Sequence, residues 1–260
     1  MSRNATKDLT TGSPMKLILG FGIPLLFGML FQQFYNMMDT IIVGKFLGVS
    51  ALASVGATGS INFMIIGFCM GVCNGFAIPV AQRFGAKDEH GMRKFVANSV
   101  WLSIIFAVVM AVLVCVFCRQ ILELMNTPED IIDGSYSYIF VIFLGIPATY
   151  MYNLLSGIMR SLGDSKTPLY LLIFSSILNI ILDLLSIIVL KMGVAGAAWA
   201  TVIAQAISGF CCLGVIWKKF PILHVQREEW QPDKLCILNL CNMGIPMGLQ
   251  YSITAIGSVI

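Results

Sequence analysis

The sequence predicts an all-α, polytopic membrane protein, and three observations carry this prediction. Hydrophobic residues make up 58% of the 260 residues, and the mean hydropathy is +0.87. Charged side chains, 16 basic and 13 acidic, make up only 11% of the chain, against about 25% in a typical soluble domain. Apolar stretches of about 20 residues, the length that crosses a bilayer as a helix, recur along the chain. A soluble globule of this size could not cover its surface with these charges.

Seven stretches are long and apolar enough to span a membrane. Each must be helical, because in lipid every backbone N–H and C=O needs a partner within the segment. Thr127-Pro128 and Thr167-Pro168 each place a capping hydroxyl before a first-turn proline, which is a helix-start signal. The predicted spans are residues 17–43, 58–80, 95–117, 138–158, 169–190, 194–217 and 235–260. We therefore expect an N-terminal segment (1–16), a six-helix lobe (17–217), a linker (218–234) and the first helix of a second lobe (235–260).

The basic residues predict the orientation of these spans. Thirteen of the 16 fall on one side, which the positive-inside rule makes the cytoplasmic side. The N-terminus is then cytoplasmic, and the protein is a multi-pass protein of the cell (inner or plasma) membrane. No cleaved signal peptide is predicted, because the first 16 residues hold no apolar core. The thirteen are Arg3, Lys7, Lys16, Arg83, Lys87, Arg93, Lys94, Arg160, Lys166, Lys218, Lys219, Arg227 and Lys234, and the other three are Lys45, Arg119 and Lys191.

Several classes of function are disfavoured by the sequence. The net charge of +3 and the lack of a basic run with interleaved aromatics argue against a nucleic-acid partner. The eight cysteines fit no metal or disulfide spacing, so we expect them to act as small apolar residues in helices. An intramembrane enzyme would need a nucleophile or metal constellation, and the spans hold neither an HExxH motif nor a histidine. We expect no enzyme and no cofactor.

Two carboxylates, Asp39 and Asp183, lie inside predicted spans. A charged carboxylate at the centre of a bilayer costs at least about 2.5–3.5 kcal/mol, so such residues usually face a cavity and handle ions or substrate. The alternative is a structural hydrogen-bonding role, or a position shallow enough for water to reach. Their neighbours favour the functional interpretation.

Polar side chains recur at helical spacing in three of the spans. Three polar faces in otherwise apolar helices are expected to point toward one another. The first span contributes Gln32, Tyr35, Asn36 and Asp39, the fifth Ser176, Asn179, Asp183 and Ser186, and the sixth Thr201, Gln205 and Ser208.

The depth of these residues supports one shared site. At 1.5 Å rise per residue, Asp39 lies about 6 Å from the outer end of the first span, and Asp183 and Thr201 each lie about 10 Å from the outer ends of theirs. Two carboxylates, an amide and a hydroxyl offer hard oxygen ligands suited to Na⁺. Two neighbouring carboxylates could instead share a proton. The sequence leaves both options open.

A short repeat indicates a second lobe. Gly22-Ile23-Pro24 in the first span recurs as Gly244-Ile245-Pro246 in the seventh, at a similar distance from the predicted cytoplasmic end. The two copies lie six spans apart and therefore keep the same orientation, which suits a parallel repeat. We expect the chain to be truncated, with a missing C-terminal lobe completing a two-lobed transporter.

The order of several motifs resembles the multidrug and toxic compound extrusion (MATE) family of cation-coupled antiporters, across essentially the whole chain. Each motif alone is modest, and their order makes the resemblance specific. They are Pro24 with NMMDTIIVG (36–44), Leu47-Gly48 with Ala51-Leu52-Ala53, AQRFGAKD (81–88), GIMRSLGDSKTP (157–168), NIILD (179–183) and GVAGAAWAT (193–201).

The resemblance implies twelve helices in two six-helix lobes around a cavity that alternates between the two faces. It implies a Na⁺ or H⁺ site at Asp39, Asn179, Asp183 and Thr201, with Na⁺ as the only metal expected. Gln32, Tyr35, Asn36 and Gln205 would form a supporting polar face. A glutamate that another branch carries on its seventh helix has no counterpart in residues 235–260.

The expected function is cation-coupled export of organic, often cationic, compounds across the cytoplasmic membrane. Small organic molecules, the coupling cation and the lipid bilayer are the expected partners. The alternative is a flippase for lipid-linked saccharide precursors with the same two-lobe architecture. A flippase cavity usually carries several basic residues, and these spans carry almost none.

Overall fold

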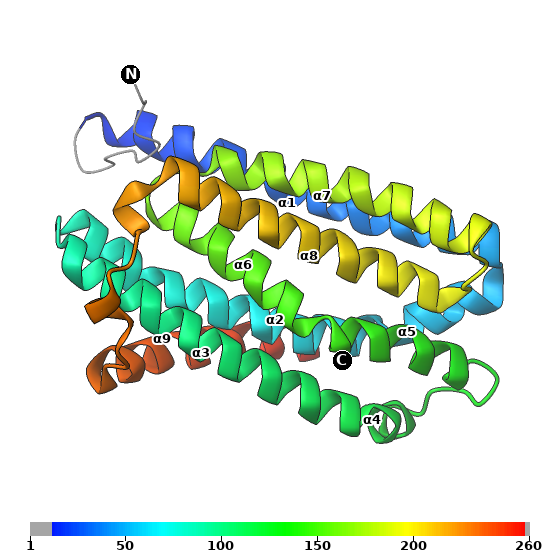
Figure 1. Ribbon diagram of the computed structural model, residues 1–260. Coiled ribbons are helices and arrows are strands. Elements are labelled where there is room, and N and C mark those ends of the chain that lie inside the picture. Colours follow the sequence, from blue (N-terminus) through cyan, green and yellow to red (C-terminus); the bar gives the residue numbers. More distant parts are fainter. Residues whose placement is uncertain (1–11, 258–260) are drawn as a thin grey trace.

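The computed structural model describes residues 12–257, so residues 1–11 and 258–260, with Arg3, Lys7 and the ends of the first and last predicted segments, lie outside it. Within the described range the chain forms nine α-helices and no strand, which confirms the all-α prediction. The helices run lengthwise in one elongated bundle (Figure 1). They are α1 (Pro14–Leu47), α2 (Val49–Gly85), α3 (Glu89–Val116), α4 (Cys118–Leu124), α5 (Ile132–Leu144), α6 (Ile146–Ser161), α7 (Lys166–Leu184), α8 (Val194–Lys219) and α9 (Lys234–Gly257).

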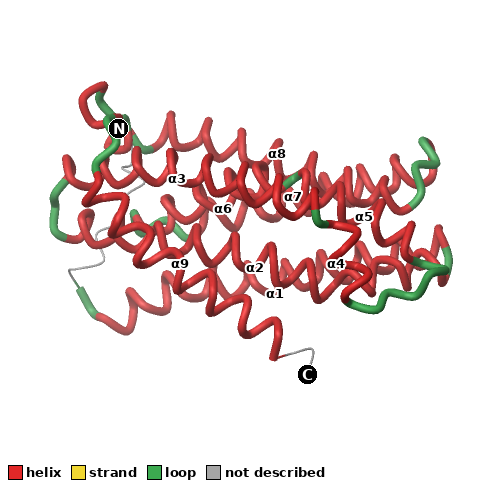
Figure 2. The backbone as a smooth tube through the Cα atoms, turned by 90° about the horizontal axis from the view of Figure 1, so that it is seen from below, coloured by secondary structure: helices red, strands yellow, loops and turns green. Residues whose placement is uncertain are grey.

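The helices account for most of the predicted spans. α1, α2, α3, α7 with the turn that follows it, and α8 are each long and apolar enough to cross a membrane, and α5 with α6 makes a sixth span if the bent pair counts as one. α9 occupies the predicted seventh span but is not among these helices, so its crossing of the membrane stays a prediction. Most connections lie at the two ends of the bundle (Figure 2), here called the Gly85 end and the Gly48 end.

The fourth predicted span is one apolar stretch in the sequence but two helices in the structure. α5 and α6 meet at Gly145 with a bend of 47°. Pro147, in the first turn of α6, has no backbone N–H to continue the ladder of α5. A Cβ at Gly145 would collide with Val202 of α8, so the missing side chain lets α8 pack against the bend.

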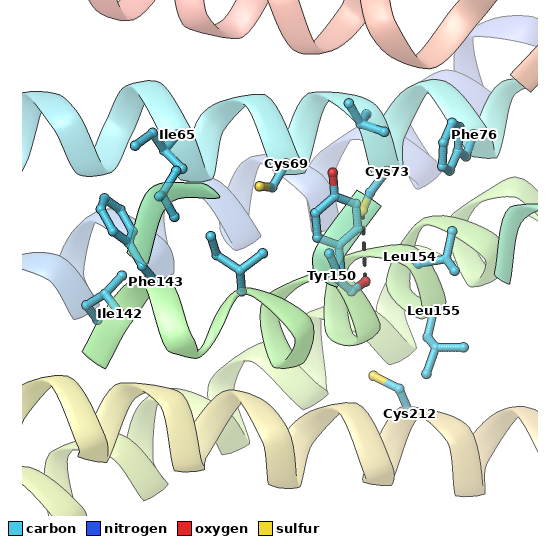
Figure 3. Packing of buried hydrophobic residues seen from close by; sticks show 14 of the residues in the cluster. Ile65, Cys69, Cys73, Phe76, Ile142, Phe143, Tyr150, Leu154, Leu155 and Cys212 are labelled. Carbon is cyan, nitrogen blue, oxygen red and sulfur yellow. Dashed lines mark hydrogen bonds between the residues drawn. The ribbon is translucent and has the colours of Figure 1, made fainter. Parts of the chain in front are cut away.

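The buried core extends over α2, α3, α5, α6 and α8, and Figure 3 shows the part of it between α2, α6 and α8. Cys69 and Cys73 of α2 face Tyr150 of α6, and the thiol of Cys73 lies 3.9 Å from the Tyr150 carbonyl oxygen. On the other side of α6, Cys212 of α8 lies 3.9 Å from the Ser156 hydroxyl. All eight cysteines fall in the described residues and are free, and five of them are buried.

Helices α2 and α9 meet through glycines. A Cβ added at Gly75 would lie 2.5 Å from the Cα of Gly244, and one at Gly71 would lie 2.6 Å from the carbonyl oxygen of Met247. Facing glycines spaced four apart, Gly71 and Gly75 against Gly244 and Gly248, let the two backbones approach closely, as in many helix pairs in membranes. This glycine seam places the first helix after the linker directly along α2.

The linker between α8 and α9 is fixed to α3 at the Gly85 end. The buried carboxylate of Glu229 accepts hydrogen bonds from Arg93 Nε at 2.9 Å and from the backbone N–H of Gln226 at 2.8 Å, and His90 Nδ1 lies 2.9 Å away. The indole N–H of Trp101 donates to the carbonyl oxygen of Trp230 at 3.1 Å. Residues 226–230 are therefore held against the N-terminal half of α3.

The hydrogen bonds that fix the linker to α3 also change the pKa of Glu229. Burial acts to raise the pKa of Glu229, but the hydrogen bonds from Gln226, Arg93 and His90 outweigh it, and the pKa lies below the ordinary glutamate value. A carboxylate with a lowered pKa in the folded state contributes stability above its unfolded pKa. That contribution is lost as the pH falls through the folded pKa.

We predict opposite effects for two alanine substitutions on α2. Gly75→Ala places a methyl group against the backbone of α9 and should lower the free energy of unfolding by about 1–3 kcal/mol. Gly59→Ala is the matched control, since a Cβ there meets nothing within 4 Å and should gain some helix propensity. Thermal unfolding of the purified protein in detergent measures both changes. Equal stability of the two variants would contradict a close contact between α2 and α9 at Gly75.

We predict that Glu229→Gln destabilises the protein at pH 7 by roughly 1.5–3 kcal/mol, because it replaces charge-assisted hydrogen bonds with neutral ones. The neighbouring Glu228→Gln is the control, because Glu228 is exposed. Unfolding measured from pH 7 down to pH 3 should show the wild type losing part of its stability below about pH 4, and Glu229→Gln losing less. If both variants follow the wild-type curve of stability against pH, the carboxylate of Glu229 does not stabilise the linker against α3.

Candidate functional site

The three predicted polar faces come together where α1, α7 and α8 lie side by side (Figure 1). Thr201 on α8 joins the other two helices. Its hydroxyl is 3.1 Å from the Tyr35 hydroxyl of α1 and accepts a hydrogen bond of 3.2 Å from Asn179 Nδ2 of α7. One residue from each helix therefore belongs to a single hydrogen-bonded group.

The two acids of the spans face each other beside this group. Asp183 near the end of α7 is fully buried, and Asp39 of α1 is its neighbour. Both carboxyl oxygens of Asp183 and Oδ1 of Asp39 are buried and have no hydrogen-bond partner among the described residues. Buried oxygens without partners are rare in folded proteins and call for an explanation.

The amide of Asn179 extends this set of oxygens. Its Nδ2 donates to Thr201, whereas its Oδ1 is buried with no partner in the described part of the chain. Four acceptor oxygens from three residues thus lack donors within one group of side chains. Oxygens of this type are hard ligands, and a small hard cation or a shared proton would satisfy them. The described residues hold no cluster of three or more His, Cys, Asp or Glu, so a cation here would depend on amide and hydroxyl oxygens as well.

The residues predicted as a supporting polar face do not all join this acid cluster. Tyr35 does, through Thr201, and Gln32 is half-buried on α1. Asn36 is exposed and donates to Gln33, so it faces away from the cluster. Gln205 points to α6, where its Oε1 accepts a hydrogen bond of 2.6 Å from the Thr149 hydroxyl.

Two features of the site were absent from the sequence prediction. Tyr138 of α5 is buried close to Asp39 and Asp183, and its hydroxyl inside a predicted span was the available signal. A π-helical turn, Leu185–Val189, begins two residues after Asp183 and carries Ser186 into the interior. Such turns often mark functional sites, but apolar periodicity does not reveal them.

Comparison with known proteins identifies relatives along almost the whole chain. The MatE family model matches residues 24–185. The probable multidrug resistance protein YoeA of Bacillus subtilis (strain 168) is 32% identical over 92% of this chain and 53% of its own length. The probable multidrug resistance protein YpnP of the same organism is 30% identical over 95% of this chain and 55% of its own. The chain spans about half the length of the curated relatives it matches.

Solved structures give the same result. An outward-facing multidrug resistance MATE family transporter of the MOP superfamily superposes with a TM-score of 0.89 at 26% identity, covering 98% of this chain and 57% of the other. A MOP superfamily transporter from Pyrococcus furiosus, described as having a binding pocket of reversed polarity, superposes with a TM-score of 0.87 at 26% identity over 96% of this chain and 55% of the other. Family model, relatives and fold agree, and this chain belongs to the MATE family of membrane transporters.

Proposed function

We propose that this chain forms the amino-terminal lobe of a cation-coupled exporter of organic, often cationic, compounds. One observation carries the coupling part of the proposal: Asp39, Asn179 and Asp183 present buried acceptor oxygens without partners, inside a chain of the MATE family. Relatives named as multidrug resistance or export proteins support the class of cargo.

The coupling cation would act on the packing of α1 against α7. With the site empty, the carboxylates of Asp39 and Asp183 repel each other, and bound Na⁺ or H⁺ removes that repulsion. A cation can shift the lobe between two conformers only by the difference in its affinity for them. Because Asp39 and Asp183 stand on different helices, a change in their separation supplies such a difference.

We further propose the cell membrane as the location, with the Gly85 end cytoplasmic. The distribution of basic residues supports this orientation. A second lobe of similar size would complete the transporter, since the relatives are about twice as long as this chain. The flippase alternative would instead move a lipid-linked saccharide, and a transport assay separates the two.

We predict that the coupling cation stabilises the wild-type chain through the acid cluster. A ligand present at 100 times its Kd stabilises the folded state by about 2.7 kcal/mol. If Na⁺ is the ligand, the unfolding temperature should be higher in Na⁺ than in choline at the same ionic strength. If H⁺ is the ligand, acidification should raise the unfolding temperature instead. Asp183→Asn should lose the response, whereas Asp133→Asn, an exposed acid on α5, should keep it. An unchanged response in Asp183→Asn would contradict the site.

We predict a graded loss of transport in the complete two-lobed protein. Asp183→Asn should abolish ion-driven efflux, Asn179→Ala should weaken cation affinity less, and Thr201→Ala should cost least. The order follows from the greater strength of contacts to a charged oxygen. Efflux from proteoliposomes, normalised to the amount of folded protein, is the measurement. Wild-type coupled turnover in Asp183→Asn would remove Asp183 from the mechanism.

A further inference from the structure

The side chain of Arg160 turns into the bundle instead of away from it. Arg160 lies in the last turn of α6, at the Gly85 end, but its Nη2 donates a hydrogen bond of 3.2 Å to Oδ1 of Asn74 on α2. Asn74 lies six residues before residue 80, the predicted end of the second span, which puts it about 9 Å inside that span. A guanidinium is therefore held within the depth of the membrane.

This guanidinium lacks a counter-charge. Among the described residues no carboxylate lies within ion-pair distance of it, although six other ion pairs form elsewhere in that range. The missing side chain of Gly157 leaves room beside the guanidinium, since a Cβ there would lie 3.9 Å from Arg160 Nη2. Arginine carries five N–H donors, and Asn74 accepts from one of its nitrogens. A charged side chain within a membrane normally has a partner or a function.

Side chains from three helices meet at the guanidinium of Arg160. Asn74 Nδ2 donates to the hydroxyl of Tyr251 on α9 at 3.5 Å, so α2, α6 and α9 each contribute one polar side chain. Arg160, Asn74 and Tyr251 are all half-buried, so the group is reachable while largely shielded from solvent. The group lies on the glycine seam near the Gly85 end. Asp39 and Asp183, by contrast, lie toward the Gly48 ends of α1 and α7.

We propose that Arg160, Asn74 and Tyr251 form a binding site for the oxyanion group, a carboxylate or its charge equivalent, of an organic ligand. The guanidinium supplies a fork of N–H donors that matches the two oxygens of a carboxylate. The Tyr251 hydroxyl supplies a further donor from the opposite side of the seam. The partial burial of the group strengthens the attraction, because less water competes for the charge.

The inference rests on the proposed function and adds a class of cargo to it. Transported compounds would include organic molecules with an acidic group, in addition to cations. Such a molecule would contact α9 and the amino-terminal lobe together. Its charge would be recognised at the end of the bundle opposite to the acid cluster, so the two sites would not compete for one ligand.

Binding of two probes of equal shape tests the proposal. The 260-residue chain in lipid nanodiscs is titrated with 2-naphthoate and with 2-naphthamide, which differ in charge but hardly in size, and binding is followed by equilibrium dialysis. We expect naphthoate to bind about tenfold or more tightly, as charge-assisted hydrogen bonds imply. Equal affinity of the wild type for the two probes overturns the proposal without any variant.

The variants assign the preference to Arg160. Arg160→Gln should abolish it, while Lys166→Gln, which removes an exposed positive charge at the same end of the bundle, should keep it. Tyr251→Phe should reduce it about two- to tenfold, and it provides a second measurement if Arg160→Gln does not fold. The proposal is overturned if Arg160→Gln still prefers naphthoate to naphthamide, or if Tyr251→Phe shows the same preference as the wild type.

This experiment is independent of transport. If the complete protein fails to export any compound, the proposed function is wrong, yet the charge preference measured in nanodiscs still stands or falls by itself. If export works and the charge preference is absent, only the oxyanion site is wrong.

Discussion

Polar groups that leave water must find partners inside the protein, and this constraint shapes every level of the structure. It makes the long segments helical, since only a helix satisfies its own backbone in lipid. It also explains the grouping of the few polar side chains of these helices. Tyr35, Asn179 and Thr201 bond to one another across three helices. Asp39 and Asp183 come to lie beside this group, and their unpartnered oxygens are the exception that gives the site its chemical meaning.

The sequence predicted what depends on composition and helical spacing. Five of the seven spans agree with helices that are apolar enough to cross a membrane, and a sixth agrees with the bent pair α5–α6 if it counts as one span. Residues from the three polar faces also meet, through Tyr35, Asn179 and Thr201. These successes have one cause, because hydrophobic length and a period of 3.6 residues are local properties. Asn36 and Gln205 show the limit of such reasoning. Each has the right spacing, but Asn36 faces outward and Gln205 bonds to Thr149 on α6.

Features that depend on contacts between distant segments could not be predicted in this way. The packing of α8 against the bend at Gly145 depends on Val202, and the closeness of Gly75 to α9 depends on Gly244, 169 residues later. Arg160 is a similar case. Counting it with the cytoplasmic residues places its backbone correctly at one end of α6, yet its side chain points along the helix toward Asn74, as side chains on a helix tend to lean toward its N-terminus.

The contact between α2 and α9 has a mechanical consequence. The glycines bring the two backbones together, and the rings of Phe68 and Phe76 on α2 lie over Gly248 and Gly244 of α9, in the space that a Cβ would need. A slide of α9 along α2 would therefore push these rings against the α9 backbone. The linker at the start of α9 is fixed to α3 as well, through Glu229. Held at its start and along its length, α9 moves with α2 and α3 as one rigid body.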